Sequence, residues 1–231
     1  MNQVIKDYKK KLTENNIEIT SIIKNPVVKE QQLLEIIENF DGIICSDDEI
    51  TSQVIDKAKK LKVICKWGTG IDSIDIEKAK QKGIRIFNSP NAFSESVASL
   101  VWGLILNLYR KISLTDKKIR IGEWPKIQGQ NIFNKTIGII GVGNIGKKII
   151  SSSIGFDLKI LANDIVRIDE DFVNKYNISL VNKDYLYEHS DIIVLCVNLN
   201  EKNVNLINKN SFIKMKKKTS DNKYFKRPSN Q

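Results

Sequence analysis

A glycine-rich turn in the second half of the chain constrains its fold more than any other feature. In the segment KTIGIIGVGNIGKKI, an apolar run at 136–140 leads directly into GVGNIG at 141–146, and a helix-forming stretch follows at once. In such a turn Gly141 permits the tight bend, Gly143 lets the backbone approach a pyrophosphate, and Gly146 lets the helix pack closely on the strand. The sequence therefore predicts a strand–turn–helix unit that binds a dinucleotide.

A carboxylate after the next apolar run indicates which dinucleotide this turn would bind. The run LKILAND ends in Asp164, which lies 18 residues beyond Gly146. At about this spacing a carboxylate bonds the ribose 2′-hydroxyl of NAD. Its charge would repel the 2′-phosphate of NADP, and only the nearby Arg167 would suit that phosphate. The motif also fits the start GxxxxGK of a phosphate loop, but that loop continues with Ser or Thr, and this chain has Lys148. We therefore expect NAD to be the cofactor.

Short β-branched runs alternate with amphipathic helical segments along most of the chain. The expected strands lie at 17–23, 41–46, 61–66, 83–88, 135–141, 158–164, 178–182 and 191–197. The expected helices lie at 29–40, 51–60, 75–82, 92–112, from Asn144 onward and at 184–190. Nearly continuous apolar strands that alternate with helices are typical of parallel sheets covered on both faces. The fold class is therefore α/β, with two doubly wound parallel-sheet domains.

The helix at 92–112 has the broadest apolar face. Its apolar positions at i, i+3, i+4 and i+7 are Val97, Leu100, Val101, Leu104, Ile105 and Leu108. A helix of this kind between two α/β halves predicts a domain linker that packs on a core. The same face would also suit contact with a second copy in a homodimer.

The net charge of +10 is concentrated in the last residues. Residues 209–231 hold eight Lys or Arg and one Asp, a net charge of +7, so the rest of the chain carries only +3. A mixed surface of this kind argues against a folded nucleic-acid-binding face and leaves only a basic arm open.

The cysteines and the longest apolar stretch bear on location. Cys45, Cys65 and Cys196 each lie in apolar runs without CxxC or zinc spacing, which favours reduced thiols and no metal site. No signal peptide opens the chain, and ASLVWGLILNL is shorter than the roughly 20 residues that span a bilayer. We therefore expect a cytoplasmic protein without a membrane segment.

Three segments together resemble the D-isomer-specific 2-hydroxyacid dehydrogenases, particularly members like phosphoglycerate dehydrogenase. They are LKVICKWGTGIDSIDIEKAKQKGIRIFNSPNAFSESVASL, GEWPKIQGQNIFNKTIGIIGVGNIGKKI and SDIIVLCVNLNEKNVNLINKNSFIKMKK. The resemblance implies the N-terminal part of a flavodoxin-like substrate domain at 1–91 and a Rossmann NAD-binding domain at 92–218. Both domains would be incomplete, because the first strand of the substrate domain is expected to be missing, and 219–231 would be a non-homologous polar tail.

The resemblance also implies a substrate site. Gly68, Thr69 and Gly70 match the turn whose backbone N–H groups hold the substrate carboxylate, and Lys66 stands just before it, where many members have Arg. Taken without the resemblance, this stretch would be an ordinary glycine turn.

On the cofactor side the resemblance implies four further residues. Ser89 matches a residue near the nicotinamide, although the Ser-Pro pair is otherwise a plain turn. Asn144 and Ile145 match the pair at the pyrophosphate, and Val197, within Cys-Val-Asn, matches the loop that lines the adenine pocket. The chain departs from the family pattern at Ser99, which replaces a usual Glu, and at Asn134, which replaces a usual Gly.

The catalytic residues of the family are not found in this chain. The family uses an Arg in a segment like IINTSRG, then a Glu, then a His that moves the hydroxyl proton while hydride passes to NAD. The one histidine, His189, does not match that position, and we expect a surface residue at a helix end. The resemblance therefore implies an NAD-dependent oxidoreductase acting on a D-2-hydroxy acid such as 3-phosphoglycerate by descent, inactive in this chain. The alternative is a non-catalytic NAD-binding or dimerising remnant.

The polar tail TSDNKYFKRPSNQ stands where the resemblance implies a buried strand. With permitted codon choices, reading this stretch one base later can encode Ile-Ile-Asn-Thr-Ser-Arg-Gly. We therefore hold a truncated or frameshifted gene as a hypothesis, which the DNA sequence beyond the stop codon would test.

Overall fold

The computed structural model describes residues 2–22, 27–198 and 203–216. Its contacts divide the chain into two units, which are treated separately here. The first unit comprises Met1–Trp67 and Ser73–Asn88, and the second comprises Gly68–Asp72 and Ser89–Gln231. The polar tail at 219–231 lies outside the described residues.

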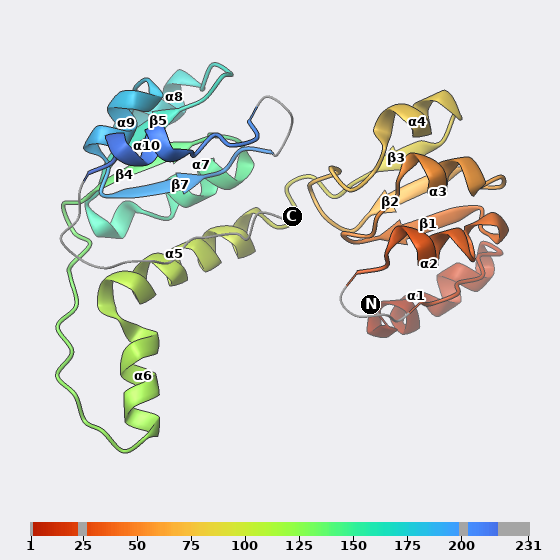
Figure 1. Ribbon diagram of the computed structural model, residues 1–231, viewed down its shortest axis with the longest axis horizontal. Helices are drawn as coiled ribbons and strands as arrows, with labels where there is room; N and C mark the ends of the chain where they lie inside the picture. The colour runs from red at the N-terminus through yellow and green to blue at the C-terminus, as the bar shows by residue number, and fades with distance from the viewer. Residues whose placement is uncertain (1, 23–26, 199–202, 217–231) are drawn as a thin grey trace. The chain divides into compact units, whose positions relative to one another are not determined.

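The first unit is a parallel three-stranded sheet with helices packed on it (Figure 1). Its strands, in the order β1-β2-β3, are Gly42–Cys45, Val63–Lys66 and Arg85–Phe87. Its helices are α1 (Asn2–Glu14), α2 (Glu30–Leu34), α3 (Ser52–Lys57) and α4 (Ile76–Gln81), with a 3₁₀ turn at Ile37–Asn39. Thr51 and Asp75 cap α3 and α4 by accepting hydrogen bonds from Val54 and Lys78 backbone N–H groups. The core is aliphatic, and Leu33, Ile55 and Ile64 are fully buried.

One expected strand of the first unit is absent. Residues 17–22 of the predicted 17–23 strand form no regular structure, and Ile17, Ile19 and Ile22 are exposed. Among the described strands, β1 pairs only with β2, and none pairs with this segment. The prediction was wrong because a β-branched run becomes a strand only where a neighbouring strand supplies hydrogen-bond partners.

The second unit is a parallel four-stranded sheet in the order β6-β5-β4-β7. The strands are β4 (Thr136–Ile140), β5 (Lys159–Asn163), β6 (Ile178–Leu180) and β7 (Ile192–Leu195). Its helices are α5 (Ser94–Arg110), α6 (Ile112–Arg120), α7 (Asn144–Ser151), α8 (Glu170–Lys175), α9 (Lys183–His189) and α10 (Lys209–Lys214), with a 3₁₀ turn at Ile154–Phe156. Successive strands run outward from β4 to β6, and the chain then returns to place β7 on the other side of β4. The carboxyl end of β4 is therefore the switch point at which open α/β sheets bind ligands.

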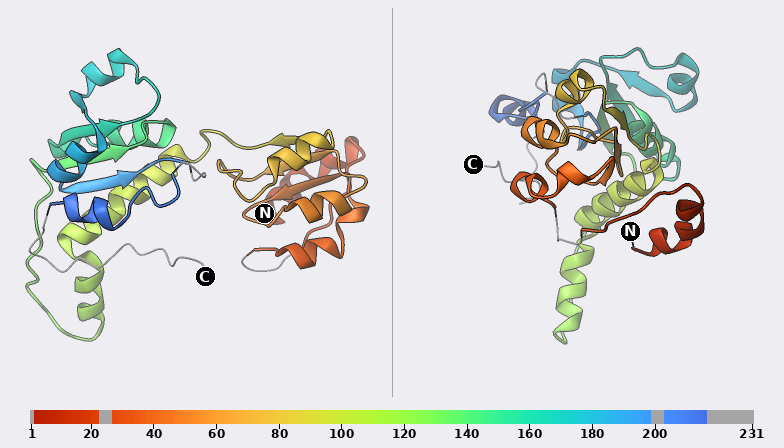
Figure 2. Two further views of the ribbon diagram at one scale, coloured as in Figure 1. Left: turned by 45° about the horizontal axis from the view of Figure 1, so that its top comes forward. Right: turned by 90° about the vertical axis from the view of Figure 1, so that its right-hand side faces the viewer.

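Both faces of this sheet are covered, which confirms the doubly wound fold class. Ile137 and Ile139 of β4 join the large cluster that includes the buried residues of α5 and α7. The side chain of Ile140 lies on the opposite face of the sheet and joins a smaller cluster with Leu186 and Tyr187 of α9. Figures 1 and 2 show helices on the two sides of the same sheet.

The long helix α5 packs with a different face from the one expected. Its buried residues are Ala98, Trp102, Ile105 and Tyr109, whereas Leu100 is 62% exposed. Trp102 stacks on Phe156 at 5.0 Å between ring centroids and donates from Nε1 to the Ile149 carbonyl at 3.2 Å. The indole and phenol rings therefore define the packed face, and only Ile105 of the expected leucine-rich stripe is fully part of it.

A separate helix, α6, follows α5 and was not anticipated. Lys111, with φ of 55° in the left-handed region, breaks the helical path between them. No residue of α6 is buried, and the helix projects from the sheet of its own unit (Figures 1 and 2). Among the described helices none alone is long and apolar enough to cross a membrane, and α5 and α6 meet that test only together, as a pair bent by 67°.

Candidate functional site

The glycine-rich turn leaves the carboxyl end of β4 with a backbone that only glycine accommodates. Gly141 has φ of +92°, and its N–H donates to the Asn163 carbonyl of the neighbouring strand at 2.8 Å. A Cβ on Gly141 would lie 2.7 Å from the Cys196 carbonyl oxygen and 2.9 Å from Cγ1 of Val197. Both the torsion and the crowding therefore require glycine at this position.

Gly146 brings α7 against this turn. A Cβ on Gly146 would overlap the Gly141 carbonyl oxygen and lie 3.5 Å from a methyl of Ile139. Helix α7 can sit this close to β4 only because the third motif residue has no side chain.

Gly143 differs from the other two glycines because the chain itself does not require it. Its φ is −72°, which any residue can adopt, and a Cβ placed there would meet nothing within 4 Å. A glycine at a position with ordinary torsion and open space leaves room for an external group to approach the backbone. The glycine motif predicts that a pyrophosphate approaches the backbone at this position.

The start of α7 is suited to a negative group at that position. Gly143 is the N-cap and offers no side-chain acceptor, and the first turn, which begins with Asn144 and Ile145, holds no acidic residue. The N–H groups and positive dipole end of a helix start attract phosphate. The structure thus places Asn144 and Ile145 directly beside the open space at Gly143.

Asp164 follows β5 and lies against the same turn. Its Oδ2 accepts a hydrogen bond from the Val142 N–H at 2.5 Å, and its Oδ1 accepts one from the Val166 N–H at 2.9 Å. The carboxylate therefore braces the glycine-rich turn in addition to the ribose role expected from the sequence. Spacing alone could not reveal this second role, because it depends on two strand ends meeting at one edge of the sheet.

Val197 completes this group from the end of β7. Its side chain is 38% exposed, and Cγ1 faces Gly141. Burial raises the pKa of the neighbouring Cys196 thiol to about 11, so that this thiol stays protonated at neutral pH.

The predicted substrate residues form a second group. The Ser89 N–H donates to the Gly68 carbonyl at 2.9 Å, which brings the predicted nicotinamide and carboxylate residues together. Thr69 and Gly70 are exposed in the turn that follows. Lys66 is buried, and its ammonium donates to the Ser46 carbonyl, to Asp47 Oδ1 at 2.8 Å and to Ser73 Oγ at 3.3 Å. Lys66 therefore ties the ends of β1 and β2 to residue 73.

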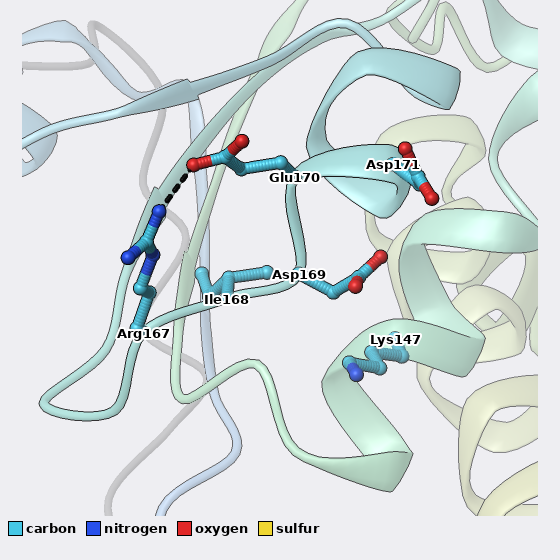
Figure 3. Close-up of a pocket in the computed structure, with 6 residues that line it drawn as sticks. All are labelled: Lys147, Arg167, Ile168, Asp169, Glu170 and Asp171. Carbon is cyan, nitrogen blue, oxygen red and sulfur yellow. Dashed lines mark hydrogen bonds and ion pairs between the residues drawn. The ribbon is translucent and has the colours of Figure 1, made fainter.

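Two pockets adjoin α7. One has a volume of about 570 Å³ and is lined by Lys147, Arg167, Ile168, Asp169, Glu170 and Asp171 (Figure 3). The other has a volume of about 650 Å³ and includes Asn144, Lys147 and Lys148 with residues of α5 and α8. Lys147 lines both pockets, and its ammonium lies 5.5 Å from the centroid of the Phe172 ring. Sequence reasoning missed Lys147, although its position one turn after Asn144 was a usable signal.

His189 lies apart from these pockets. It is exposed at the last position of α9, its ring stacks on Tyr185 at 3.8 Å, and its Nδ1 lies 2.9 Å from the Tyr185 carbonyl oxygen. The expectation of a surface histidine at a helix end is confirmed.

Comparison with known proteins agrees with this geometry. A family model described as the NAD binding domain of D-isomer specific 2-hydroxyacid dehydrogenases matches residues 102–220. A hydroxypyruvate reductase of Thermotoga maritima is 35% identical over 208 residues, which cover 89% of this chain and 65% of the relative. A D-3-phosphoglycerate dehydrogenase of Methanocaldococcus jannaschii is 36% identical over 81% of this chain and 36% of its own length.

A solved structure has a similar fold. The crystal structure of the PH0520 protein of Pyrococcus horikoshii is 32% identical, with a TM-score of 0.69, and the match covers 90% of this chain and 64% of that one. The chain thus spans less than two thirds of each of these proteins.

Proposed function

The chain belongs to the D-isomer-specific 2-hydroxyacid dehydrogenase family, and from that membership we propose that its second unit binds NAD at the glycine-rich turn. The observation that carries the proposal is the open space at Gly143, where neither torsion nor packing calls for glycine. A ligand that approaches the backbone accounts for the missing side chain.

In this proposal each part of NAD has a partner among the described residues. Gly143 and the start of α7 would hold the pyrophosphate, and Asp164 would hold a ribose hydroxyl beside the turn that it braces. Val197 would contact the adenine, and Ser89 would lie toward the nicotinamide. NAD, when bound, supplies a hydride acceptor.

Titration of the chain with NAD⁺ in a calorimeter tests this site. We expect saturable binding of one equivalent. An absence of saturable heat at millimolar NAD⁺ would remove the proposal.

We further propose that the chain descends from an enzyme that moves hydride between NAD and a D-2-hydroxy acid such as 3-phosphoglycerate. In that reading 1–91 is part of the substrate domain, 92–218 is the NAD-binding domain, and Gly68, Thr69 and Gly70 hold the substrate carboxylate. The backbone hydrogen bond from Ser89 to Gly68 supports this proposal, because it joins the turn expected to hold the substrate carboxylate to the residue expected near the nicotinamide.

We expect no turnover by this chain. Hydride transfer from an alcohol needs a base for the hydroxyl proton, and the one histidine stacks on Tyr185 at the end of α9. A panel of D-glycerate, D-lactate and D-3-phosphoglycerate with NAD⁺, followed at 340 nm, should give the rate of a buffer blank. A reproducible rate above that blank, abolished by heating the protein, would contradict this expectation.

A non-catalytic, dimerising role is the second candidate, and exposed apolar residues favour it. Leu100 on α5 is 62% exposed, and Trp124, after α6, is 86% exposed. Ile112, Leu114, Ile119 and Ile121 are also exposed. A nine-residue helix without buried residues has little stability of its own in water, so that a partner surface would stabilise it. We propose that two copies pair through the 92–112 helix and α6.

Light scattering measures this pairing directly. The chain should have twice the mass of one copy, and Leu100→Ser with Leu114→Ser, both at exposed positions of the proposed interface, should give the mass of a single copy. Tyr8→Ser, which removes an exposed aromatic ring from the first unit, is the control and should leave the mass unchanged. A single-copy mass for the original chain at all concentrations would exclude the dimer.

We also propose a cytoplasmic location. All three cysteines are free, and burial raises the pKa of the Cys45 thiol to about 11. Free thiols without disulfide partners are typical of proteins in a reducing compartment.

A further inference from the structure

An ion pair lines the pocket formed by the loop that follows Asp164, the predicted ribose ligand, in the chain. Arg167 and Glu170 both line the pocket of about 570 Å³, and an Arg167 Nη atom donates to Glu170 Oε1. Figure 3 shows the guanidinium reaching toward the Glu170 carboxylate, with Lys147 on α7 at the other side of the pocket. Arg167 is the residue near Asp164 that would suit the 2′-phosphate of NADP.

The backbone places Arg167 close to the ribose that Asp164 is predicted to bind. Asp164 Oδ1 accepts from the N–H of Val166, and Arg167 is the next residue. The other oxygen of the same carboxylate accepts from Val142 in the glycine-rich turn. A ribose whose 2′-position lies at Asp164 would therefore present a 2′-phosphate to the loop that carries Arg167.

Arg167 can bind that 2′-phosphate only when its guanidinium is not already paired with a carboxylate. Arginine binds phosphate oxygens in a bidentate manner, and Lys147 adds a second positive charge to the same pocket. In the structure, however, a carboxylate already holds the guanidinium, and Asp169 and Asp171 bring two more negative charges. A 2′-phosphate would have to displace Glu170 and remain close to it.

We propose that Glu170 is a specificity-determining residue of this cofactor site, because it withholds Arg167 from the 2′-phosphate of NADP. The inference rests on the proposed NAD site. It assigns the preference for NAD to two features, the Asp164 carboxylate and the Arg167–Glu170 pair, of which the second can be removed without touching the glycine-rich turn.

Glu170→Gln tests the proposal with a side chain of the same shape. The variant should bind NADP⁺ about threefold more tightly than the original chain, since it frees the guanidinium and removes one repelling charge from an exposed site. Its affinity for NAD⁺ should change less than about twofold, because NAD⁺ has no group for Arg167. The gain should shrink as KCl is raised, since both Arg167 and Glu170 are exposed.

Asp171→Asn is the matched control. It removes the same charge from the same pocket and the same helical turn but leaves the Arg167 pair intact. Adding Arg167→Met to Glu170→Gln should abolish the gain. An equal gain in Asp171→Asn, or a gain that survives Arg167→Met, would overturn the role of Glu170. Failure of the original chain to bind NAD⁺ would instead reject the cofactor site itself, before any variant is compared.

Discussion

Gly143→Ala should lower the affinity for NAD⁺ by about tenfold or more, the equivalent of roughly 1.4 kcal/mol, and should have a smaller effect on the stability of the chain. The added methyl meets no atom of the chain within 4 Å, and φ of −72° suits alanine. The methyl would instead occupy the space into which a pyrophosphate oxygen comes. The loss of glycine at the N-cap should cost no more than about 1 kcal/mol.

Calorimetric titration and thermal unfolding of the same samples separate these two effects. Gly155→Ala is the matched control, because a Cβ on Gly155 also meets open space but lies outside the motif. It should change neither affinity nor stability. If Gly143→Ala binds NAD⁺ as well as the original chain, the open space at Gly143 is not where the pyrophosphate lies.

Gly146→Ala should lower the free energy of unfolding of the second unit by about 3 kcal/mol. The methyl would overlap the Gly141 carbonyl oxygen, and the nearby Ile139 methyl leaves little room for relaxation. Helix α7 would have to move away from β4, and with it the buried Ile149 and Ile150. The unfolding temperature should fall by roughly 6–12 °C for a unit of this size.

Denaturant unfolding followed by tryptophan fluorescence measures this loss, since buried Trp102 stacks on Phe156 within the second unit. Gly103→Ala in α5 is the control, because its Cβ meets nothing within 4 Å and alanine favours a helix. That variant should be more stable by about 0.5–1 kcal/mol. Unchanged stability in Gly146→Ala would mean that α7 packs less closely on β4 than described.

The contrast between these glycines shows what could be anticipated from sequence. The motif predicted the roles of Gly141, Gly143 and Gly146 together, because the strand, the turn and the helix are contiguous in the chain. Only the tertiary structure distinguishes Gly141 and Gly146, which the fold requires, from Gly143, which it does not. The additional contact of Asp164 with Val142 likewise needed two separate strands to be brought to one edge of the sheet.

The wrong predictions concern segments whose structure depends on a neighbouring segment. The run at 17–23 has strand composition, yet no described strand pairs with residues 17–22. The spacing of the leucines predicts the apolar face of α5. In the structure, however, Trp102 and Tyr109 make the packed face, and Leu100 is exposed. Lys66 was noted only for its place before the substrate turn, and the structure shows it buried between loops.

Local periodicity and spacing were enough to predict the α/β class, the strand–turn–helix motif and the carboxylate after β5. Only the folded structure shows which glycine leaves room for a ligand, which helix face is buried, and that Asp164 braces the glycine-rich turn. These features could not be predicted because strand pairing, burial and hydrogen bonds between strand ends depend on distances between segments far apart in the chain. Those distances exist only once the parallel strands have assembled.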